Sequence, residues 1–310
     1  MKYTYLEAGV DIKKADEFTN IIADVAGKNN IGSFAGLYEH SVLGDYCFAA
    51  CCDGIGTKII PLVENSDVKT IANDLFAMNI NDLICCAAKP LFFLDYIATN
   101  TLDKTLLSNF ILELNKILKK YNCSLLGGET SELGDLILKK YFDVAGFLLG
   151  IVKKEDILSK NNTSRGDVVI ALKSNGIHAN GFSLIRRLYN DKKLNCEDFI
   201  QCLKPVRIYY DTVMQLHNKK LLNSCANITG GGISANLSRA VRDDLTLGLD
   251  WSKIPQTYLF EKLKDLTGND EAFKTFNMGV GFCLVINRKY VKKVLELTKD
   301  HDSFVFGEVE

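Results

Sequence analysis

Apolar stretches with strand-like and helix-like spacing alternate along the whole chain. In the first half, Ile71, Leu75 and Met78 follow a spacing that predicts a helix with one buried face. Short and nearly continuous apolar runs, which are typical of buried strands, lie before and after this helix. The predicted helices of this half are 68–83 and 102–121, and the predicted strands are 46–52, 91–99, 124–130 and 142–152. This alternation predicts an α/β fold.

The same alternation resumes after a polar, turn-rich segment at residues 161–166. We therefore place a domain boundary near residue 160, with a first domain of residues 1–160 and a second of residues 161–310. The second half has predicted strands at 167–172, 280–286 and 304–309, and predicted helices at 180–189, 207–218, 234–241 and 289–298.

Composition limits the classes of ligand. The 310 residues are 47% hydrophobic and carry a net charge of −1, so they provide no field that would attract nucleic acid or an anionic membrane. The N-terminus has no apolar signal core, and no apolar run approaches the roughly 18 residues that span a bilayer. We expect a cytoplasmic protein with small-molecule ligands.

The cysteines and histidines do not form a recognisable metal motif. The ten cysteines include no Cys-x-x-Cys pair, and the adjacent pairs Cys51-Cys52 and Cys85-Cys86 do not suit zinc spacing. The four histidines lie far apart in the sequence. We interpret the cysteines as small core residues of a protein in a reducing compartment.

Carboxylates next to glycines are the first candidates for chemistry. Two segments at predicted strands combine both: Asp53-Gly54-Ile55-Gly56-Thr57-Lys58 follows the strand 46–52, and Gly127-Gly128-Glu129 interrupts the strand 124–130 with paired glycines. Asp74 and Asp82 lie about two turns apart on the first predicted helix, so they can share one side of it. Magnesium prefers oxygen ligands and phosphate prefers N–H donors, so this arrangement suits magnesium-ATP.

Each of these residues also has an ordinary explanation. An Asp before Gly is common in turns, and an Asp on a helix is usually solvated or caps an end. Lys58 could neutralise a phosphate, although most lysines are simply solvated.

Two segments of the second half are further candidates. The loop Thr229-Gly230-Gly231-Gly232 precedes a predicted helix and is either a phosphate seat or a flexible connector. It lacks the ending of a Walker A loop, and no dinucleotide fingerprint is present. His178 lies in a polar loop with glycines on both sides, where an imidazole could exchange protons with a substrate or have no catalytic role. These patterns alone indicate a phosphate-binding α/β enzyme.

Taken in order, the motifs resemble those of the aminoimidazole ribonucleotide synthetase family. In the first half they are Ala8-Gly9-Val10-Asp11, Asp53-Gly54-Ile55-Gly56-Thr57-Lys58, Asn79-Ile80-Asn81-Asp82-Leu83, Phe92-Phe93-Leu94-Asp95-Tyr96 and Gly127-Gly128-Glu129-Thr130. In the second half they are His178-Ala179-Asn180-Gly181, Pro205-Val206-Arg207, Thr229-Gly230-Gly231-Gly232 and Thr275-Phe276-Asn277-Met278-Gly279-Val280-Gly281. The match spans almost the whole chain.

The resemblance implies an enzyme that uses ATP to close formylglycinamidine ribonucleotide to aminoimidazole ribonucleotide, in a homodimer of two-domain chains with mixed sheets. It implies that Asp53, Asp82 and Glu129 hold magnesium and the triphosphate, with Asp74 nearby and Lys58 on phosphate. His178 would act on the substrate, and residues 229–232 would hold its ribose phosphate. The resemblance is also consistent with a second chain covering a sheet edge near residues 46–52.

Some features depart from the family pattern or leave other functions open. The departures are Leu6-Glu7, Leu133-Gly134 and the stretch 135–141, and they concern the loop over the site rather than the fold. One alternative is a sister activity on the same fold, of the selenophosphate synthetase or thiamine monophosphate kinase type. The other is a catalytically silent nucleotide-binding subunit.

Overall fold

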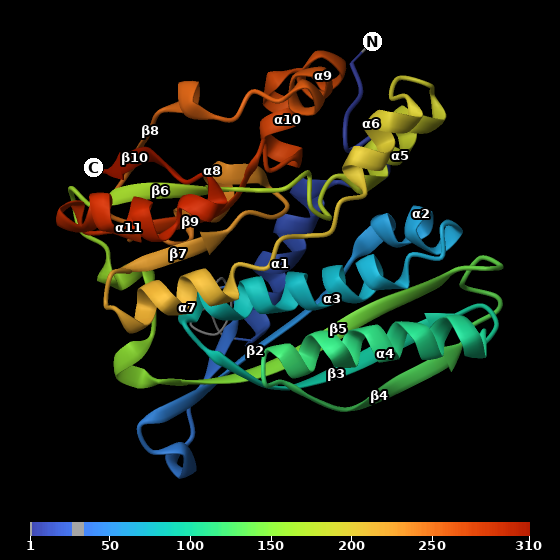
Figure 1. Cartoon of the computed structure of the whole chain (residues 1–310), viewed down its shortest axis with the longest axis horizontal. Coiled ribbons are helices and arrows are strands. Elements are labelled where there is room, and N and C mark those ends of the chain that lie inside the picture. The colour runs from blue at the N-terminus through green and yellow to red at the C-terminus, as the bar shows by residue number, and fades with distance from the viewer. Residues whose placement is uncertain (1, 27–33) are drawn as a thin grey trace.

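The computed structural model describes residues 2–26 and 34–310, which form two five-stranded sheets and the helices that pack on them (Figure 1). The predicted α/β fold is therefore confirmed. Within these described ranges, no helix is long and apolar enough to cross a membrane.

The first sheet has the strand order β1-β2-β5-β3-β4. Its strands are β1 Gly36–Tyr38, β2 Tyr46–Gly54, β3 Lys89–Thr99, β4 Ser124–Glu132 and β5 Phe142–Lys153. The sheet is mixed, because β3 and β4 run parallel whereas the other neighbours are antiparallel. The expected sheet edge near residues 46–52 is covered only in part, because β5 pairs along β2 on one side whereas β1 pairs only with residues 48–50 on the other.

The second sheet has the order β7-β9-β6-β10-β8. Its strands are β6 Val168–Lys173, β7 Ser224–Asn227, β8 Leu247–Leu249, β9 Val280–Ile286 and β10 Phe304–Val309. All four pairings are antiparallel, so the expected mixed sheet is present only in the first half. The reason is that β9 inserts between β6 and β7, which would otherwise be parallel neighbours joined by a helical crossover.

Two helices cover only one face of the first sheet. The helices of this half are α1 Ile12–Ala26, α2 Ile59–Glu64, α3 Val68–Leu83 and α4 Lys104–Lys120. α3 and α4 pack together on the sheet, and α3 lies between the sheet and the second half of the chain (Figure 1). On the opposite face, where no helix of the described residues packs, the large side chains of Tyr46, Tyr96 and Phe147 are exposed.

The second sheet is covered on both faces, since β7 and β9 are buried along their whole length. The helices of this half are α5 Phe182–Asn190, α6 Cys196–Cys202, α7 Tyr210–Asn218, α8 Gly232–Ser238, α9 Tyr258–Thr267, α10 Asn269–Thr275 and α11 Val291–Leu297. One hydrophobic core contains residues of both sheets, for example Phe93 of β3 and Phe282 of β9. The two halves are therefore joined through a shared apolar interior.

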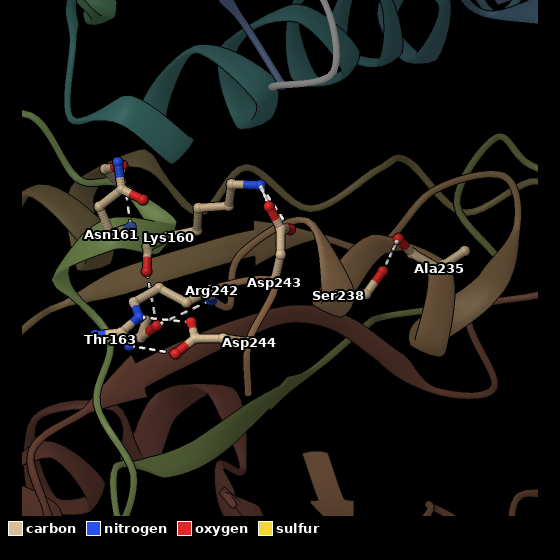
Figure 2. A network of polar contacts seen from close by, with 9 residues as sticks. Lys160, Asn161, Thr163, Ala235, Ser238, Arg242, Asp243 and Asp244 are labelled. Atoms are coloured by element: carbon tan, nitrogen blue, oxygen red, sulfur yellow. Dashed lines mark hydrogen bonds and ion pairs between the residues drawn. The ribbon is translucent and has the colours of Figure 1, made fainter. Parts of the chain in front are cut away.

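The segment that connects the two sheets is attached to the chain beyond α8 (Figure 2). Lys160 Nζ is 2.7 Å from Asp243 Oδ1, and the Arg242 N–H donates to Thr163 Oγ1 at 3.2 Å. Arg242 also pairs with Asp244. These contacts hold the connection against the second half of the chain.

Candidate functional site

Lys58 and Asp74 form a buried ion pair. Lys58 ends the loop that follows β2, Asp74 lies on α3, and both side chains are fully buried, with Lys58 Nζ 2.7 Å from Asp74 Oδ2. Lys58 Nζ also donates to the Lys204 carbonyl at 2.6 Å, and the Val206 N–H donates to Asp74 Oδ1 at 2.7 Å. The pair links the two halves of the chain, and its charges neutralise each other. Contacts of these two residues with ATP stay predictions that this geometry does not favour.

Asp53 and Asp82 form a second buried acidic arrangement, in which the charge of Arg239 acts on Asp82. Asp53 lies near the end of β2, where Asn79 accepts a hydrogen bond from its N–H and donates one to its carbonyl, both at 3.1 Å. Burial raises the pKa of Asp53 to about 6. Burial, together with the nearby Asp53 charge, raises the pKa of Asp82 to about 7, against the lowering effects of the Asn227 hydrogen bond and the Arg239 charge. No lysine or arginine of the described residues forms an ion pair with either carboxylate.

Two neighbouring carboxylates, of which Asp53 raises the pKa of Asp82, fit a divalent cation. Magnesium is typically held by one or two protein carboxylates together with substrate phosphates and water. Asp53 and Asp82 supply such a pair at the boundary between the two halves of the chain.

Glu129 is not part of this pair in the single chain. In the β3–β4 register Asp95 lies opposite Gly128 and Tyr96 opposite Glu129. Since side chains alternate along a strand, Glu129 points to the uncovered face of the sheet, together with the exposed Tyr96. Among residues 2–26 and 34–310, no group of three His, Cys, Asp or Glu side chains is placed to hold a metal. A magnesium site with all three predicted ligands from one chain is therefore not assembled.

The glycines beside Glu129 have a packing role. A side chain at Gly128 would overlap the carbonyl and the carboxylate of Asp95. Gly128 therefore lets β4 approach the buried Asp95, whose pKa is raised by burial. Direct binding of ATP by Gly127 and Gly128 stays a prediction.

The glycine loop 229–232 is a rigid connection between β7 and α8. Asn236 Nδ2 lies 3.2, 3.1 and 2.8 Å from the carbonyl oxygens of Thr229, Gly230 and Gly232. Gly232 has a φ of +75°, and a side chain there would overlap the Phe273 carbonyl. The hydrogen bonds to Asn236 restrain this loop, and its role in phosphate binding stays a prediction.

Directly before this loop, Asn227 contacts the acidic pair. Asn227 Nδ2 donates to Asp82 Oδ1 at 2.8 Å, across 145 residues of sequence. The predicted magnesium ligand on α3 and the predicted phosphate loop after β7 thus lie side by side at the boundary.

His178 is buried rather than exposed in its loop. It has a φ of +61° and is 2% exposed, with its ring 6.2 Å from that of Tyr209. Burial, together with the charges of Lys58 and Arg207, lowers the pKa of His178 to about 3. His178 is therefore neutral across the physiological range, and its catalytic role stays a prediction.

Three of the predicted loops meet at the boundary. Thr57 Oγ1, in the loop after β2, is 3.0 Å from Ser183 Oγ in the first turn of α5. A side chain at Gly230 would begin 3.7 Å from Asn180 Oδ1, in the loop that contains His178. Loops from both halves of the chain thus surround the acidic pair.

A cavity of about 690 Å³ lies elsewhere, at the end of β3. It is lined by the stretch 99–103 and by 139–142, at the end of the loop that departs from the family pattern. Asn100 Nδ2 fixes that loop by donating to the carbonyls of Gly134 at 2.9 Å and Ile137 at 2.7 Å. None of the predicted site residues lines this cavity.

Sequence reasoning missed the roles of Asn79 and Asn227. Asn79 belongs to one of the family motifs, and Asn227 lies two residues before the glycine loop. Nothing in the sequence indicates which carboxylate the side-chain amide of either residue will contact. Both became visible only through their hydrogen bonds to Asp53 and Asp82.

Comparison with protein families gives two matches that together cover most of the chain. Residues 35–152 match the family described as AIR synthase related protein, N-terminal domain. Residues 164–310 match AIR synthase related protein, C-terminal domain.

Curated relatives align over nearly their full length. A phosphoribosylformylglycinamidine cyclo-ligase of Ligilactobacillus salivarius is 37% identical, over 98% of this chain and 95% of that protein. A protein of the same name from Thermodesulfovibrio yellowstonii is 35% identical, over 99% of this chain and 96% of that protein.

Solved structures share the fold at low sequence identity. A HypE–HypF complex contains a chain that is 16% identical, with a TM-score of 0.69 over 94% of this chain and 92% of that one. AaThiL complexed with AMPPCP and TMP is also 16% identical, with a TM-score of 0.67 over 94% of this chain and 89% of that one. These structures support the fold alone.

Proposed function

From the premise that the chain belongs to the AIR synthase related family, we propose that it is an ATP-dependent ligase of purine biosynthesis. The substrate is formylglycinamidine ribonucleotide and the products are aminoimidazole ribonucleotide, ADP and phosphate. The observation that carries this proposal is the 37% identity with a phosphoribosylformylglycinamidine cyclo-ligase over nearly both full lengths.

In the proposed reaction, ATP phosphorylates the formyl oxygen of the substrate, and a nitrogen of the same molecule then attacks the carbon that bore it. Phosphate leaves, and the imidazole ring closes. The protein contributes positioning and charge stabilisation rather than a covalent intermediate.

ATP and magnesium are the proposed cofactors. Asp53 and Asp82 would hold magnesium, which would neutralise charge on the phosphates when bound. Support comes from the unpaired carboxylates and from AaThiL, a protein of the same fold that binds the ATP analogue AMPPCP. The loop 229–232 would bind the ribose phosphate through its backbone N–H groups.

His178 would act by shape and neutral hydrogen bonding rather than as a charged acid, because burial keeps its pKa far below neutrality. The Lys58–Asp74 ion pair would hold the loop 53–58 in place against α3. We thus propose the first domain as the ATP-binding part and the second as the support for the substrate phosphate.

We also propose a homodimer in the cytoplasm. The uncovered face of the first sheet, with Tyr96 43% exposed and Phe147 37% exposed, supports a second copy as its cover. The ten free cysteines support a reducing compartment. Sedimentation of the wild type and Phe147→Lys would test the dimer, since a charge on this face would shift the population to monomer.

The test of the function is ADP release with magnesium-ATP, with and without formylglycinamidine ribonucleotide, alongside a colour assay for the aminoimidazole. We expect substrate-dependent ADP that matches product one for one and is lost in Asp82→Asn. ATP binding without substrate-stimulated turnover would contradict the proposal and favour a sister activity or a silent subunit.

A further inference from the structure

Asn227, a residue of the second domain, forms a hydrogen bond with the acidic pair. It is the last residue of β7 and is 2% exposed. Its Nδ2 donates to Asp82 Oδ1 at 2.8 Å. The donor and the acceptor belong to different halves of the chain, so the hydrogen bond forms only when the halves are packed together.

The backbone around Asn227 is held on both sides. Asn227 lies opposite Phe282 in the β7–β9 pairing, and the next residue, Ile228, donates its N–H to the Gly281 carbonyl at 3.1 Å. Asn236 then fixes the loop that begins at Thr229. Asn227 is therefore a rigid reference point between Asp82 and the glycine loop.

The contact leaves the second oxygen of Asp82 available. No hydrogen bond from a described residue reaches Asp82 Oδ2, whereas Oδ1 accepts the Asn227 amide. A neutral amide orients the carboxylate without cancelling its charge. A lysine in the same place would cancel it, as Lys58 does for Asp74.

We propose that Asn227 is a positioning residue, which orients Asp82 so that Oδ2 faces a bound magnesium ion and which fixes the distance from that ion to the loop 229–232. This inference rests on the proposed function and deepens it. Through the hydrogen bond from Asn227 to Asp82, the second domain would directly influence magnesium binding by the first domain.

The test compares Asn227→Ala with a matched control, Asn81→Ala. Asn81 is also a buried amide that joins α3 to the second domain, because it donates to the Arg207 carbonyl at 2.8 Å and accepts from the Tyr209 N–H at 3.0 Å. Neither of these hydrogen bonds involves Asp82. Both variants lose a hydrogen bond between the halves, but only Asn227→Ala loses the orientation of Asp82.

Two readouts separate positioning from packing. The first is the magnesium concentration for half-maximal ADP release, and the second is magnesium-dependent binding of AMPPCP by calorimetry, which needs no turnover. We expect Asn227→Ala to raise the required magnesium concentration by about 10- to 100-fold, the usual effect of removing the partner of a metal ligand. Asn81→Ala should lower the unfolding temperature but leave the magnesium dependence unchanged.

Two further substitutions at Asn227 test whether the amide donor itself is required. Asn227→His, whose ring N–H can replace the amide donor, should restore most of the magnesium affinity. Asn227→Leu keeps the volume without the donor, so it should behave as the alanine variant does and serves if alanine does not fold. Equal magnesium dependence in wild type, Asn227→Ala and Asn227→Leu would overturn the inference. If the wild type binds magnesium-AMPPCP but forms no aminoimidazole, the proposed function fails while the binding comparison still tests Asn227.

Discussion

Two aspartates on the same helix, Asp74 and Asp82, have opposite surroundings. Both face the second half of the chain from α3, and each accepts a hydrogen bond from it, from Val206 and Asn227 respectively. Asp74 also meets a lysine ammonium at 2.7 Å. Among the described residues, Asp82 forms no ion pair comparable to that of Asp74; the charge of Asp53 raises its pKa and the charge of Arg239 lowers it.

The difference shows how the partner decides the role of a buried carboxylate. Moving a charge out of water costs several kcal/mol in effective terms, and a close opposite charge offsets much of that cost. The Lys58–Asp74 pair is neutral as a unit and stabilises the boundary. The Asp53–Asp82 pair keeps an uncompensated negative charge, which a bound cation would offset.

The largest expected effect is on stability, from breaking the neutral pair. Lys58→Met leaves Asp74 buried without a counter-charge, so we expect a loss of about 3–5 kcal/mol in the free energy of unfolding. Urea unfolding followed by circular dichroism measures it. The double variant Lys58→Met/Asp74→Leu should recover most of the loss, and a single variant as stable as the wild type would refute the structural role of this pair.

The next largest effect is on activity, from changing a carboxylate of the Asp53–Asp82 pair. Asp53→Asn should lower kcat/KM by about 10²–10³-fold, the range seen when one preorganised charge-stabilising group is lost. The fold should be unchanged, since Asn can keep the hydrogen bond that Asp53 Oδ1 accepts from the Gly54 N–H. Steady-state ADP release measures the change, with circular dichroism as the check on folding. Full activity in Asp53→Asn would remove this residue from the site.

A smaller effect is the pH dependence of magnesium binding. With pKa values of about 6 for Asp53 and about 7 for Asp82, protons compete with the metal below pH 7. We expect magnesium-dependent AMPPCP binding to strengthen by roughly tenfold or more between pH 6 and pH 8. Calorimetry at several pH values, with proton release from the buffer heat, measures it. A pH-independent affinity would mean that the two carboxyls are already ionised at pH 6.

The smallest expected effect is a gain of stability in the metal-free protein. A raised carboxyl pKa means that the folded state holds the proton more tightly, so its contribution to stability is present below pH 4 and is lost as pH rises through about 7. At pH 8, Asp82→Asn removes the buried charge and should stabilise the metal-free chain by about 1 kcal/mol. Urea unfolding of the wild type and Asp82→Asn, in the presence of a chelator at pH 8 and pH 5, measures the difference. We expect the variant to gain less stability at pH 5 than at pH 8. Asp74→Asn should lower the free energy of unfolding instead. A change of the same sign in both variants would contradict the difference proposed between the two aspartates.

The sequence predicted the long helices that bury one face and the strands that are buried on one or both faces. The helix 68–83 and the strands 280–286 and 304–309 begin and end at the predicted residues. It missed α1, α6, α9 and α10, whose apolar positions are fewer or interrupted by charged residues. It also placed α8 at 234–241 rather than Gly232–Ser238, because the start of that helix depends on two glycines with positive φ.

The candidate site was predictable as a set of residues but not as a geometry. Motif order identified Asp53, Asp82, Glu129 and the loop 229–232, and their family relationship is confirmed by the matches over both halves of the chain. Motif order assigned magnesium to Asp82 and left Asp74 nearby, but it did not indicate that Lys58 pairs with Asp74. It also did not indicate that His178 is buried.

The sequence alone determined the family, the alternation of strands and helices and the residues near the chemistry, because these depend on local periodicity and on motif order. Only the tertiary structure decided which carboxylate is neutralised, which face Glu129 occupies and which amide orients Asp82. Those outcomes depend on contacts between residues far apart in the chain and on the pleat of a strand within its sheet. Burial then sets the cost of each charge, and burial belongs to the packed fold rather than to any segment of it.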